Sequence, residues 1–285
     1  MYNYLSEENI DRFIELALQE DIMDGDHSSL ASVPAMAENK ANLIIKSEGI
    51  IAGIALAERI FKKVDPGISI EILIGDGKKV YYGDIAFKVK GKAQSILSAE
   101  RLVLNCMQRM SGIATYTTKL NQLIADTSTH LLDTRKTTPN FRIAEKWAVK
   151  IGGGQNHRFG LFDMVMLKDN HVDFAGGIEP AIRGTVAYLK EKKLNLKIEI
   201  ETRNLGEVEE VLKVGMVDII MLDNMSPEIM SEALEMINGD YITEASGGIT
   251  EETIRKVAET GIDYISVGAL THSAPSLDMS LKAVS

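Results

Sequence analysis

The sequence is poor in positive charge and in long apolar runs, and each shortage excludes a class of protein. Acidic residues outnumber basic ones by 41 to 31, which gives a formal net charge of -10. Nucleic acid or an anionic membrane would require a broad basic face, and this balance argues against one. No run approaches the roughly 20 apolar residues of a membrane-spanning helix, and residues 1–4 have no basic segment leading into an apolar one. We therefore expect a cytoplasmic protein without nucleic acid or a membrane as its partner.

Cysteine is equally scarce, because Cys106 is the single one among 285 residues and excludes a disulfide within the chain. It stands among apolar residues typical of a helix, so we interpret it as a buried structural thiol rather than a nucleophile. With 45% hydrophobic and 25% charged residues, the chain can bury one large core or two modest ones.

The first part of the chain predicts separate layers of strands and helices. Ser6 is placed to cap a helix that ends before the acidic turn at residues 20–26. Short β-rich runs follow at residues 43–45, 68–74 and 85–89, with a helix at 55–64 and a long helix from Ser98. We expect an N-terminal α+β sandwich domain at residues 1–110.

The second part, residues 111–285, repeats an apolar run, a turn and a helical pattern six times. The runs occupy residues 131–132, 164–167, 198–200, 219–222, 241–242 and 264–267. Such alternation indicates parallel strands, which could form an open doubly wound sheet or a barrel. Polar residues follow nearly every run, whereas an open sheet would gather them at one switch point. We therefore favour an incomplete α/β barrel with fewer than eight strands. Whether the last helix of this domain packs back on the first domain stays open at this point.

Five cationic or ionisable side chains follow the first barrel strands, namely Arg135, Lys136, His157, Arg158 and Lys168. Each alone could be an ordinary surface charge. Together they would repel one another unless an anion neutralises them. Because the arginine fork matches a carboxylate bidentately, a substrate with more than one carboxylate fits this cluster.

Glu201 and Asp223 each close a predicted strand and could hold Mg²⁺ beside a substrate's phosphates. They could equally be salt-bridge partners of the lysines. Glu199 shares the face of Glu201, so spacing alone leaves open which of the two is the ligand.

Glycines occur at two places that suit anions. Those at residues 152–154 either end a helix or let the backbone approach an anion before His157. Ser246, Gly247, Gly248 and Gly268 follow the last two strands, where neighbouring barrel strands commonly form a phosphate seat. Neither a Walker motif nor a G-x-G-x-x-G fingerprint is present.

Four segments resemble the quinolinate phosphoribosyltransferase (nicotinate-nucleotide pyrophosphorylase, carboxylating) family. They are SAERLVLNCMQRMSGIAT, LDTRKTTPNFRIAEKWAVKIGGGQNHRFGL, MLKDNH, and EASGGIT with SVGALTHSAPSLD. The resemblance implies transfer of phosphoribosyl from phosphoribosyl pyrophosphate to quinolinate with decarboxylation, which gives nicotinate mononucleotide for NAD biosynthesis. It also implies a sandwich, an incomplete barrel and a homodimer with shared active sites, with assembly into hexamers left open.

The resemblance also implies a role for individual residues. It assigns the quinolinate carboxylates to Arg135, His157, Arg158, Lys168 and, from the partner subunit, Arg101. Lys136 would contact both substrates near the reacting centre. Glu201 and Asp223, with Asp169 nearby, would hold the magnesium ion and the ribose pyrophosphate, and Ser246, Gly247, Gly248 and Gly268 the 5-phosphate.

The sequence departs from the family pattern at three places. Asn140 replaces a usual glycine, Trp147 a common tyrosine, and residues 216–217 add one position before the Asp223 strand. Two rival interpretations stay open: a paralogue of molybdenum-transport operons with another substrate, and a noncatalytic barrel that binds anionic metabolites. Lys168 argues against the first rival, and the paired carboxylates argue against the second.

Overall fold

The computed structural model describes residues 3–284, which divide into two compact units. One unit consists of Lys119–Arg135 and Gly154–Gly268, and we call it the barrel unit. The other, the sandwich unit, consists of residues 3–118, 136–153 and 269–284. Helix α4 (Ala93–Leu123) contributes to both units. The predicted boundary between residues 110 and 111 falls inside this helix and stays a prediction.

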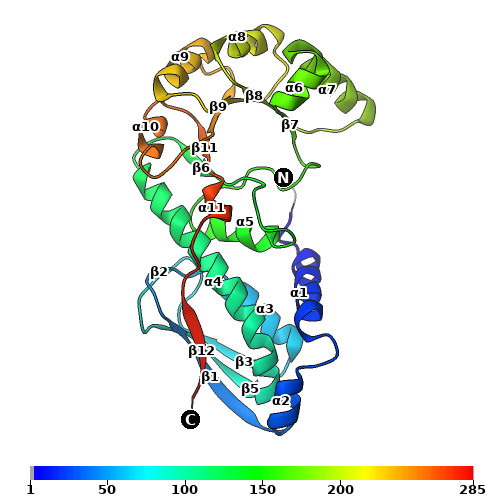
Figure 1. Ribbon diagram of the computed structural model, residues 1–285, viewed down its shortest axis with the longest axis vertical. Coiled ribbons are helices and arrows are strands. Elements are labelled where there is room, and N and C mark those ends of the chain that lie inside the picture. The colour runs from blue at the N-terminus through cyan, green and yellow to red at the C-terminus, as the bar shows by residue number, and fades with distance from the viewer. Residues whose placement is uncertain (1–2, 285) are drawn as a thin grey trace. The chain divides into compact units, whose positions relative to one another are not determined.

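The sandwich unit is built on a four-stranded antiparallel sheet of order β12-β1-β5-β3. Its strands are β1 (Glu38–Ile45), β3 (Ser69–Ile72), β5 (Ile85–Lys92) and β12 (Met279–Val284), and β2 (Gly49–Ile50) pairs with β4 (Lys79–Val80). Figure 1 shows α3 (Ile54–Val64) and α4 lying along this sheet. Phe61 of α3 and Phe87 of β5 are buried and meet edge to face, with ring centroids 6.0 Å apart. Strands and helices therefore occupy separate layers, as predicted.

Further helices of this unit are α1 (Glu7–Ile22), α2 (His27–Ser32), α5 (Arg142–Ile151) and α11 (Ala269–His272). The Ser6 hydroxyl caps α1 by accepting the Asn9 N–H at 3.3 Å, as expected. The predicted end of α1 was wrong, because the helix runs through the acidic residues to Ile22. Glutamate and aspartate do not stop a helix, whereas Met23 does so here with a positive φ of 43°. The chain's last element is strand β12, which pairs with β1.

The barrel unit contains six parallel strands in the order β6-β11-β10-β9-β8-β7. They are β6 (His130–Leu132), β7 (Val165–Leu167), β8 (Ile198–Thr202), β9 (Ile219–Asp223), β10 (Ile242–Ser246) and β11 (Tyr264–Ser266). From β7 to β11 each strand pairs with the next one in the sequence, and β11 pairs with the first strand, β6. β6 and β7 do not pair with each other. A doubly wound sheet would reverse its order at a switch point, so this pairing confirms the incomplete barrel.

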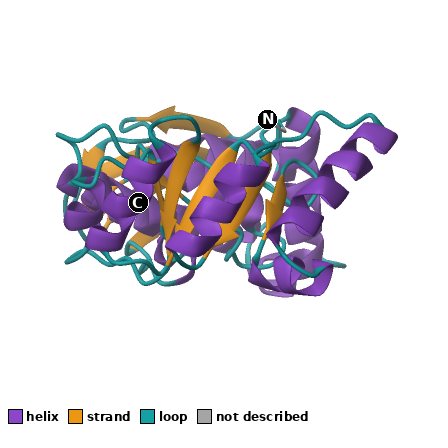
Figure 2. Ribbon diagram, turned by 90° about the horizontal axis from the view of Figure 1, so that it is seen from above, coloured by secondary structure: helices purple, strands orange, loops and turns teal. Residues whose placement is uncertain are grey.

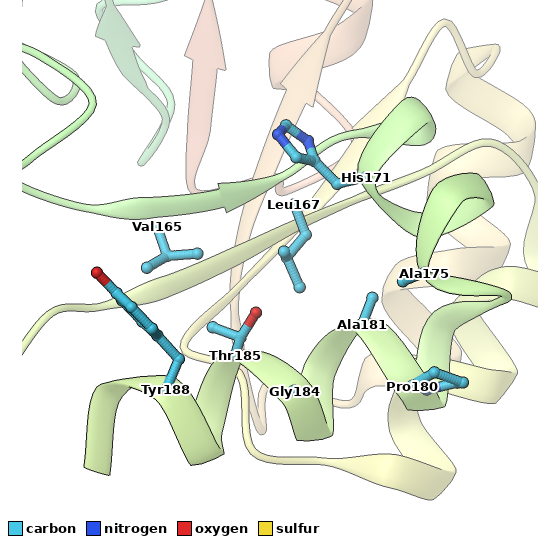
Figure 3. A pocket seen from close by; sticks show the side chains of 9 residues that line it. All are labelled: Val165, Leu167, His171, Ala175, Pro180, Ala181, Gly184, Thr185 and Tyr188. Atoms are coloured by element: carbon cyan, nitrogen blue, oxygen red, sulfur yellow. The ribbon is translucent and has the colours of Figure 1, made fainter. Parts of the chain in front are cut away.

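Helices cover the outside of the barrel strands, as Figures 1 and 2 show. They are α6 (Asp169–Ala175), α7 (Ile178–Lys192), α8 (Leu205–Val214), α9 (Pro227–Ile237) and α10 (Ile254–Ala258). Figure 3 shows Val165 and Leu167 pointing from β7 towards α7, where they line a mostly apolar pocket with Tyr188. Met166, between them, must face the barrel interior because side chains of a strand alternate.

Two expectations about single features can be compared with the structure. Cys106 is fully buried, and burial raises the pKa of its thiol to about 12, which confirms a structural thiol. Among residues 3–284, no helix combines the length and the apolar character that a membrane crossing requires.

Candidate active site

The predicted site residues of the barrel unit lie at the carboxyl ends of its strands. Because all six strands are parallel, these ends share one edge of the barrel. In the order of the chain they are Arg135 after β6, Lys168 and Asp169 after β7, Glu201 in β8, Asp223 ending β9, Ser246 ending β10 with Gly247 and Gly248, and Gly268 after β11. Arg101 and Lys136 belong to the sandwich unit.

His157 and Arg158 reach this edge through a segment that runs alongside β6. Gln155 bridges Leu132 in parallel, and its N–H donates to the Leu131 carbonyl at 2.8 Å. Asp133, fully buried just past β6, then accepts the His157 N–H at 2.9 Å and the Asn156 side-chain amide at 2.7 Å. The buried carboxylate therefore fixes the backbone that carries the two basic residues.

His157 lies against two glutamates inside the barrel. Its Nε2 atom is 3.0 Å from Glu199 and 3.3 Å from Glu244, which are hydrogen-bonding distances. The three residues are at most 9% exposed. Among the histidine, cysteine, aspartate and glutamate side chains of residues 3–284, this is the one set of three that brings its ligand atoms within 4.8 Å of one another.

The charges in this cluster influence one another strongly. Burial lowers the pKa of His157, but the hydrogen bonds and charges of Glu199 and Glu244 outweigh it and raise the pKa to about 10. Burial and the Glu244 charge raise the pKa of Glu199. The Arg158 N–H donates to His157 Nδ1 at 2.6 Å, which instead favours a neutral ring. We favour the imidazolium, because two buried carboxylates without a cation cost more than one peptide hydrogen bond.

Arg158 presents a second buried charge. Its guanidinium is half-buried and donates to the Met164 carbonyl at 3.2 Å and to the Met166 sulfur at 3.5 Å. Burial and the neighbouring charge of Arg135 lower the pKa of Arg158. Two guanidinium groups whose positive charges repel each other favour an anion between them.

Lys168 and Glu201 form an ion pair of 2.9 Å at the ends of β7 and β8. Lys168 is exposed, whereas Glu201 is 8% exposed. His171 closes the turn that carries Lys168, since its Nδ1 accepts the Lys168 N–H at 3.0 Å and its own N–H donates to the Lys168 carbonyl at 2.8 Å. The sequence did not predict this role of His171.

Asn224 joins the ends of β9 and β10. Its side-chain amide donates to Asp223 at 2.6 Å, and its N–H donates to the Ser246 carbonyl at 2.8 Å. Gly247 and Gly248 follow with φ of 90° and 62°, a backbone region that favours glycine. A Cβ on Gly247 would stand 2.3 Å from the Asn224 side-chain oxygen. Close approach as well as backbone conformation therefore requires glycine there.

Two contributors to this edge, Glu244 and Asn224, were not predicted from the sequence. Glu244 lies two residues before Ser246, so the strand period of two could have placed both on one face. Its contact with His157 joins positions far apart in the chain, which periodicity cannot reveal. Asn224 could have been considered a candidate site residue because it follows Asp223, but its link to the next strand depends on the glycine turn after β10.

Three loops bear on features that the sequence left open. Asn140 has a φ of 61°, the left-handed conformation that glycine adopts readily and asparagine tolerates. Gly152 caps the C-terminus of α5, and Gly153 has a φ of 87°, so these glycines end a helix. In the barrel unit, Met216 has a φ of 64° in the loop before β9, where the extra residue was expected.

Comparisons with known proteins cover almost the whole chain. Models of the N-terminal and C-terminal domains of quinolinate phosphoribosyl transferase match residues 26–111 and 113–282. Quinolinate phosphoribosyltransferase (decarboxylating) 1 of Nicotiana glauca is 50% identical over 286 residues, which cover 94% of this chain and 81% of that protein. A probable nicotinate-nucleotide pyrophosphorylase (carboxylating) of Synechocystis is 40% identical, covering 96% and 92% of the two chains.

A crystal structure of NadC from Streptococcus pyogenes agrees with the fold, with a TM-score of 0.90, 39% sequence identity and 99% of each chain covered. The matched models span both halves of the sequence, and the relatives align along their length. The chain therefore belongs to the quinolinate phosphoribosyltransferase family.

Proposed function

We propose that the protein catalyses the reaction named for its family, the transfer of phosphoribosyl from phosphoribosyl pyrophosphate to quinolinate with decarboxylation. The products are nicotinate mononucleotide, pyrophosphate and carbon dioxide, in the biosynthesis of NAD. The observation that carries the proposal is the edge of the barrel, where basic side chains and a glycine turn meet in an otherwise acidic protein. Two anionic substrates suit that edge.

Quinolinate is a dicarboxylate, and three cations of the barrel unit suit its binding. Arg135 and Arg158 offer planar forks that bind carboxylates bidentately, and Lys168 offers a point charge. His157, held as a cation by its two glutamates, adds positive charge close to Arg158. Arg101 is exposed on α4 and would join the carboxylates from the partner subunit.

The phosphoribosyl substrate would be oriented by the neighbouring strand ends. Ser246, Gly247, Gly248 and Gly268 would hold its 5-phosphate with hydroxyl and backbone donors. Lys136 would contact both substrates and balance the charge of the departing pyrophosphate. As the bond between the anomeric carbon of the ribose and the pyrophosphate oxygen breaks, the pyridine nitrogen of quinolinate forms a bond to the same carbon. The electron pair of the bond to the 2-carboxylate then stays on ring carbon 2, where the adjacent cationic nitrogen stabilises it, as the carboxylate leaves as carbon dioxide. That carbon takes up a proton from water to give nicotinate mononucleotide.

Magnesium is the proposed cofactor, and the donor set fits it. Glu201, Asp223 and Asp169 offer hard oxygen ligands, but they do not form a preassembled cluster among the described side chains. Mg²⁺ is commonly held by one or two carboxylates together with substrate phosphates, which matches such an open set. When bound, the ion would supply charge neutralisation at the pyrophosphate. Glu199 is the weaker candidate, because it is fully buried against His157, whereas the ion-pair partner of Glu201 is the exposed Lys168.

A homodimer with shared active sites completes the proposal, and hexamers would be assemblies of such dimers. We also propose a cytoplasmic location, consistent with the acidic composition. Relatives with chloroplastic and mitochondrial names show that the family also occurs elsewhere.

The test is product formation from quinolinate and phosphoribosyl pyrophosphate with Mg²⁺, compared with nicotinate as the acceptor. We expect nicotinate mononucleotide from quinolinate and at least about a hundredfold lower kcat/KM for nicotinate, because a monocarboxylate leaves one of the half-buried guanidinium groups of Arg135 and Arg158 without its counter-charge, at a cost of several kcal/mol. Comparable efficiency for both acids would contradict the assigned pocket. Absence of product from quinolinate would favour the molybdenum-operon paralogue or a noncatalytic binding barrel.

A further inference from the structure

A buried ion pair in the sandwich unit ties together the segments around Lys136. Arg109 of α4 lies 3.0 Å from Glu145 of α5, and the glutamate side chain is fully buried. Arg109 also donates to the Ala274 carbonyl at 2.7 Å and to the carbonyl of Thr271. One guanidinium therefore binds α5 and the chain at and beyond α11.

Both partners of this ion pair lead directly to the Lys136 loop. Glu145 accepts the Thr138 N–H at 2.9 Å and the Thr138 hydroxyl at 3.0 Å. Thr271, whose carbonyl Arg109 binds, donates its own hydroxyl to the Lys136 carbonyl at 2.8 Å. The backbone of Lys136 is thus held at its own carbonyl and again two residues later, while its side chain is exposed.

Stability alone is a poor explanation for this arrangement. A buried ion pair often contributes no more than an apolar pair of the same volume, because both charges must be desolvated. What an apolar pair could not do is accept one peptide N–H and bind two carbonyls in fixed directions. What the network specifically determines is the position of the Lys136 backbone.

We propose that Glu145 and Arg109 are positioning residues, which act through Thr138 and Thr271 to hold Lys136 where phosphoribosyl transfer needs its ammonium group. The inference rests on the role proposed for Lys136. Neither residue belongs to the proposed substrate-binding set, so their loss should affect turnover more than binding. A misplacement of about 1 Å can lower a rate by about a hundredfold.

The first test is Glu145→Gln, which keeps the shape of the side chain and removes its charge. We expect kcat to fall by about tenfold to a hundredfold, with the KM of each substrate changed by less than about threefold. Combination with Lys136→Ala provides the decisive readout. If Glu145 acts through Lys136, Glu145→Gln lowers kcat little further once Lys136 is absent, whereas a general structural defect would multiply the two losses.

Asp11→Asn is the control, because it breaks a more exposed ion pair of 2.8 Å, with Arg59 in the same unit, that is not part of the Arg109–Glu145 network. It should keep wild-type kcat. Thr271→Val removes only the hydroxyl that binds the Lys136 carbonyl and keeps the volume, so it replaces Glu145→Gln if that variant does not fold. Its kcat should fall in the same direction.

The positioning role would be overturned by an unchanged kcat in Glu145→Gln or Thr271→Val, or by losses of kcat that multiply when Glu145→Gln is combined with Lys136→Ala. Turnover by the wild-type protein would still uphold the proposed function in that case. A wild-type protein without turnover would overturn both. An equal loss in Asp11→Asn would show that any broken ion pair of the unit has this effect, and would likewise overturn the inference.

Discussion

Three buried ionisable residues face one another in the barrel, and their protonation decides how much positive charge stands beside Arg158. His157 offers one cation to Glu199 and Glu244, and Arg158 contributes further charge that lowers the pKa of Glu199. A neutral His157 would leave both carboxylates inside the barrel without the cation that they contact. The cluster is therefore compatible with burial only while protons or arginines neutralise it.

We predict that His157 is an imidazolium at pH 7.5, with both ring nitrogens protonated. Its pKa is raised from the usual 6.5 to about 10, so its stabilisation is fully present below about pH 6.5 and is lost as the pH rises through about 10. Nitrogen-15 spectra of the five histidines, assigned by comparison with His157→Gln, provide the measurement. A neutral ring with hydrogen on Nε2 alone at pH 7.5 would contradict it.

Glu201 and Asp223 provide a second prediction at the residue scale. Replacing either by alanine should lower kcat by about a hundredfold or more, since charge stabilisation by a metal contributes several kcal/mol and each 1.36 kcal/mol is tenfold in rate. The Mg²⁺ concentration for half-maximal rate should rise, while quinolinate binding measured by calorimetry stays close to wild type. Glu199→Gln is the control, and should leave the Mg²⁺ requirement unchanged. Wild-type activity of Glu201→Ala at limiting Mg²⁺ would remove its metal role.

At the scale of elements, the turns after the strands decide what the barrel edge can bind. The glycine turn after β10 combines a left-handed backbone with a contact to Asn224, which itself has a φ of 54°. Side-chain donation from Asn224 to Asp223 links this turn to the end of β9. The proposed phosphate seat and one proposed metal ligand are thus mechanically connected.

We predict that Gly247→Ala damages this seat beyond the cost of its backbone conformation. Alanine at a φ of 90° costs about 1 to 3 kcal/mol of stability, and its Cβ would also displace Asn224. Gly239→Ala is the matched control, because Gly239 has a φ of 77° and no atom within 4 Å of an added Cβ. Both variants should lose stability in urea, Gly247→Ala more because its Cβ displaces Asn224, but the KM for phosphoribosyl pyrophosphate should rise by about tenfold or more only in Gly247→Ala. Equal KM values in the two variants would argue against the seat.

The elements that sequence could predict are those whose burial follows from their own residues. All six barrel strands were predicted, because each is a short apolar run followed by a turn and a helix. Strand β12 was not, since it exists through pairing with β1, more than 200 residues earlier, and only Met279 and Leu281 on it are buried. The same limit applies to the site: the basic residues could be recognised in motifs, but the contact of His157 with Glu244 depends on the curvature of the incomplete barrel, which brings distant parts of the chain together.

At the scale of the whole molecule, the proposed reaction needs residues of both units. Arg101 and Lys136 lie in the sandwich unit, and the other residues proposed to bind the carboxylates and the 5-phosphate lie in the barrel unit. Arg101 is exposed on α4, in a chain segment that precedes the first barrel strand by almost thirty residues. Family resemblance implies that it serves the barrel of a second copy of the chain, and a two-fold dimer would provide two such sites.

We predict that two inactive variants, Arg101→Ala and Arg135→Ala, restore activity when their subunits exchange. In a mixed dimer the barrel of the Arg101→Ala subunit keeps its own Arg135 and receives Arg101 of the partner, so one of its two sites is complete. Statistical mixing of equal amounts would therefore recover about a quarter of wild-type activity. The measurement is product formation after exchange, with exchange itself followed by mass spectrometry of differently labelled subunits. If Arg101 acted within its own chain, every site would carry one lesion, and demonstrated exchange without recovered activity would exclude a shared site.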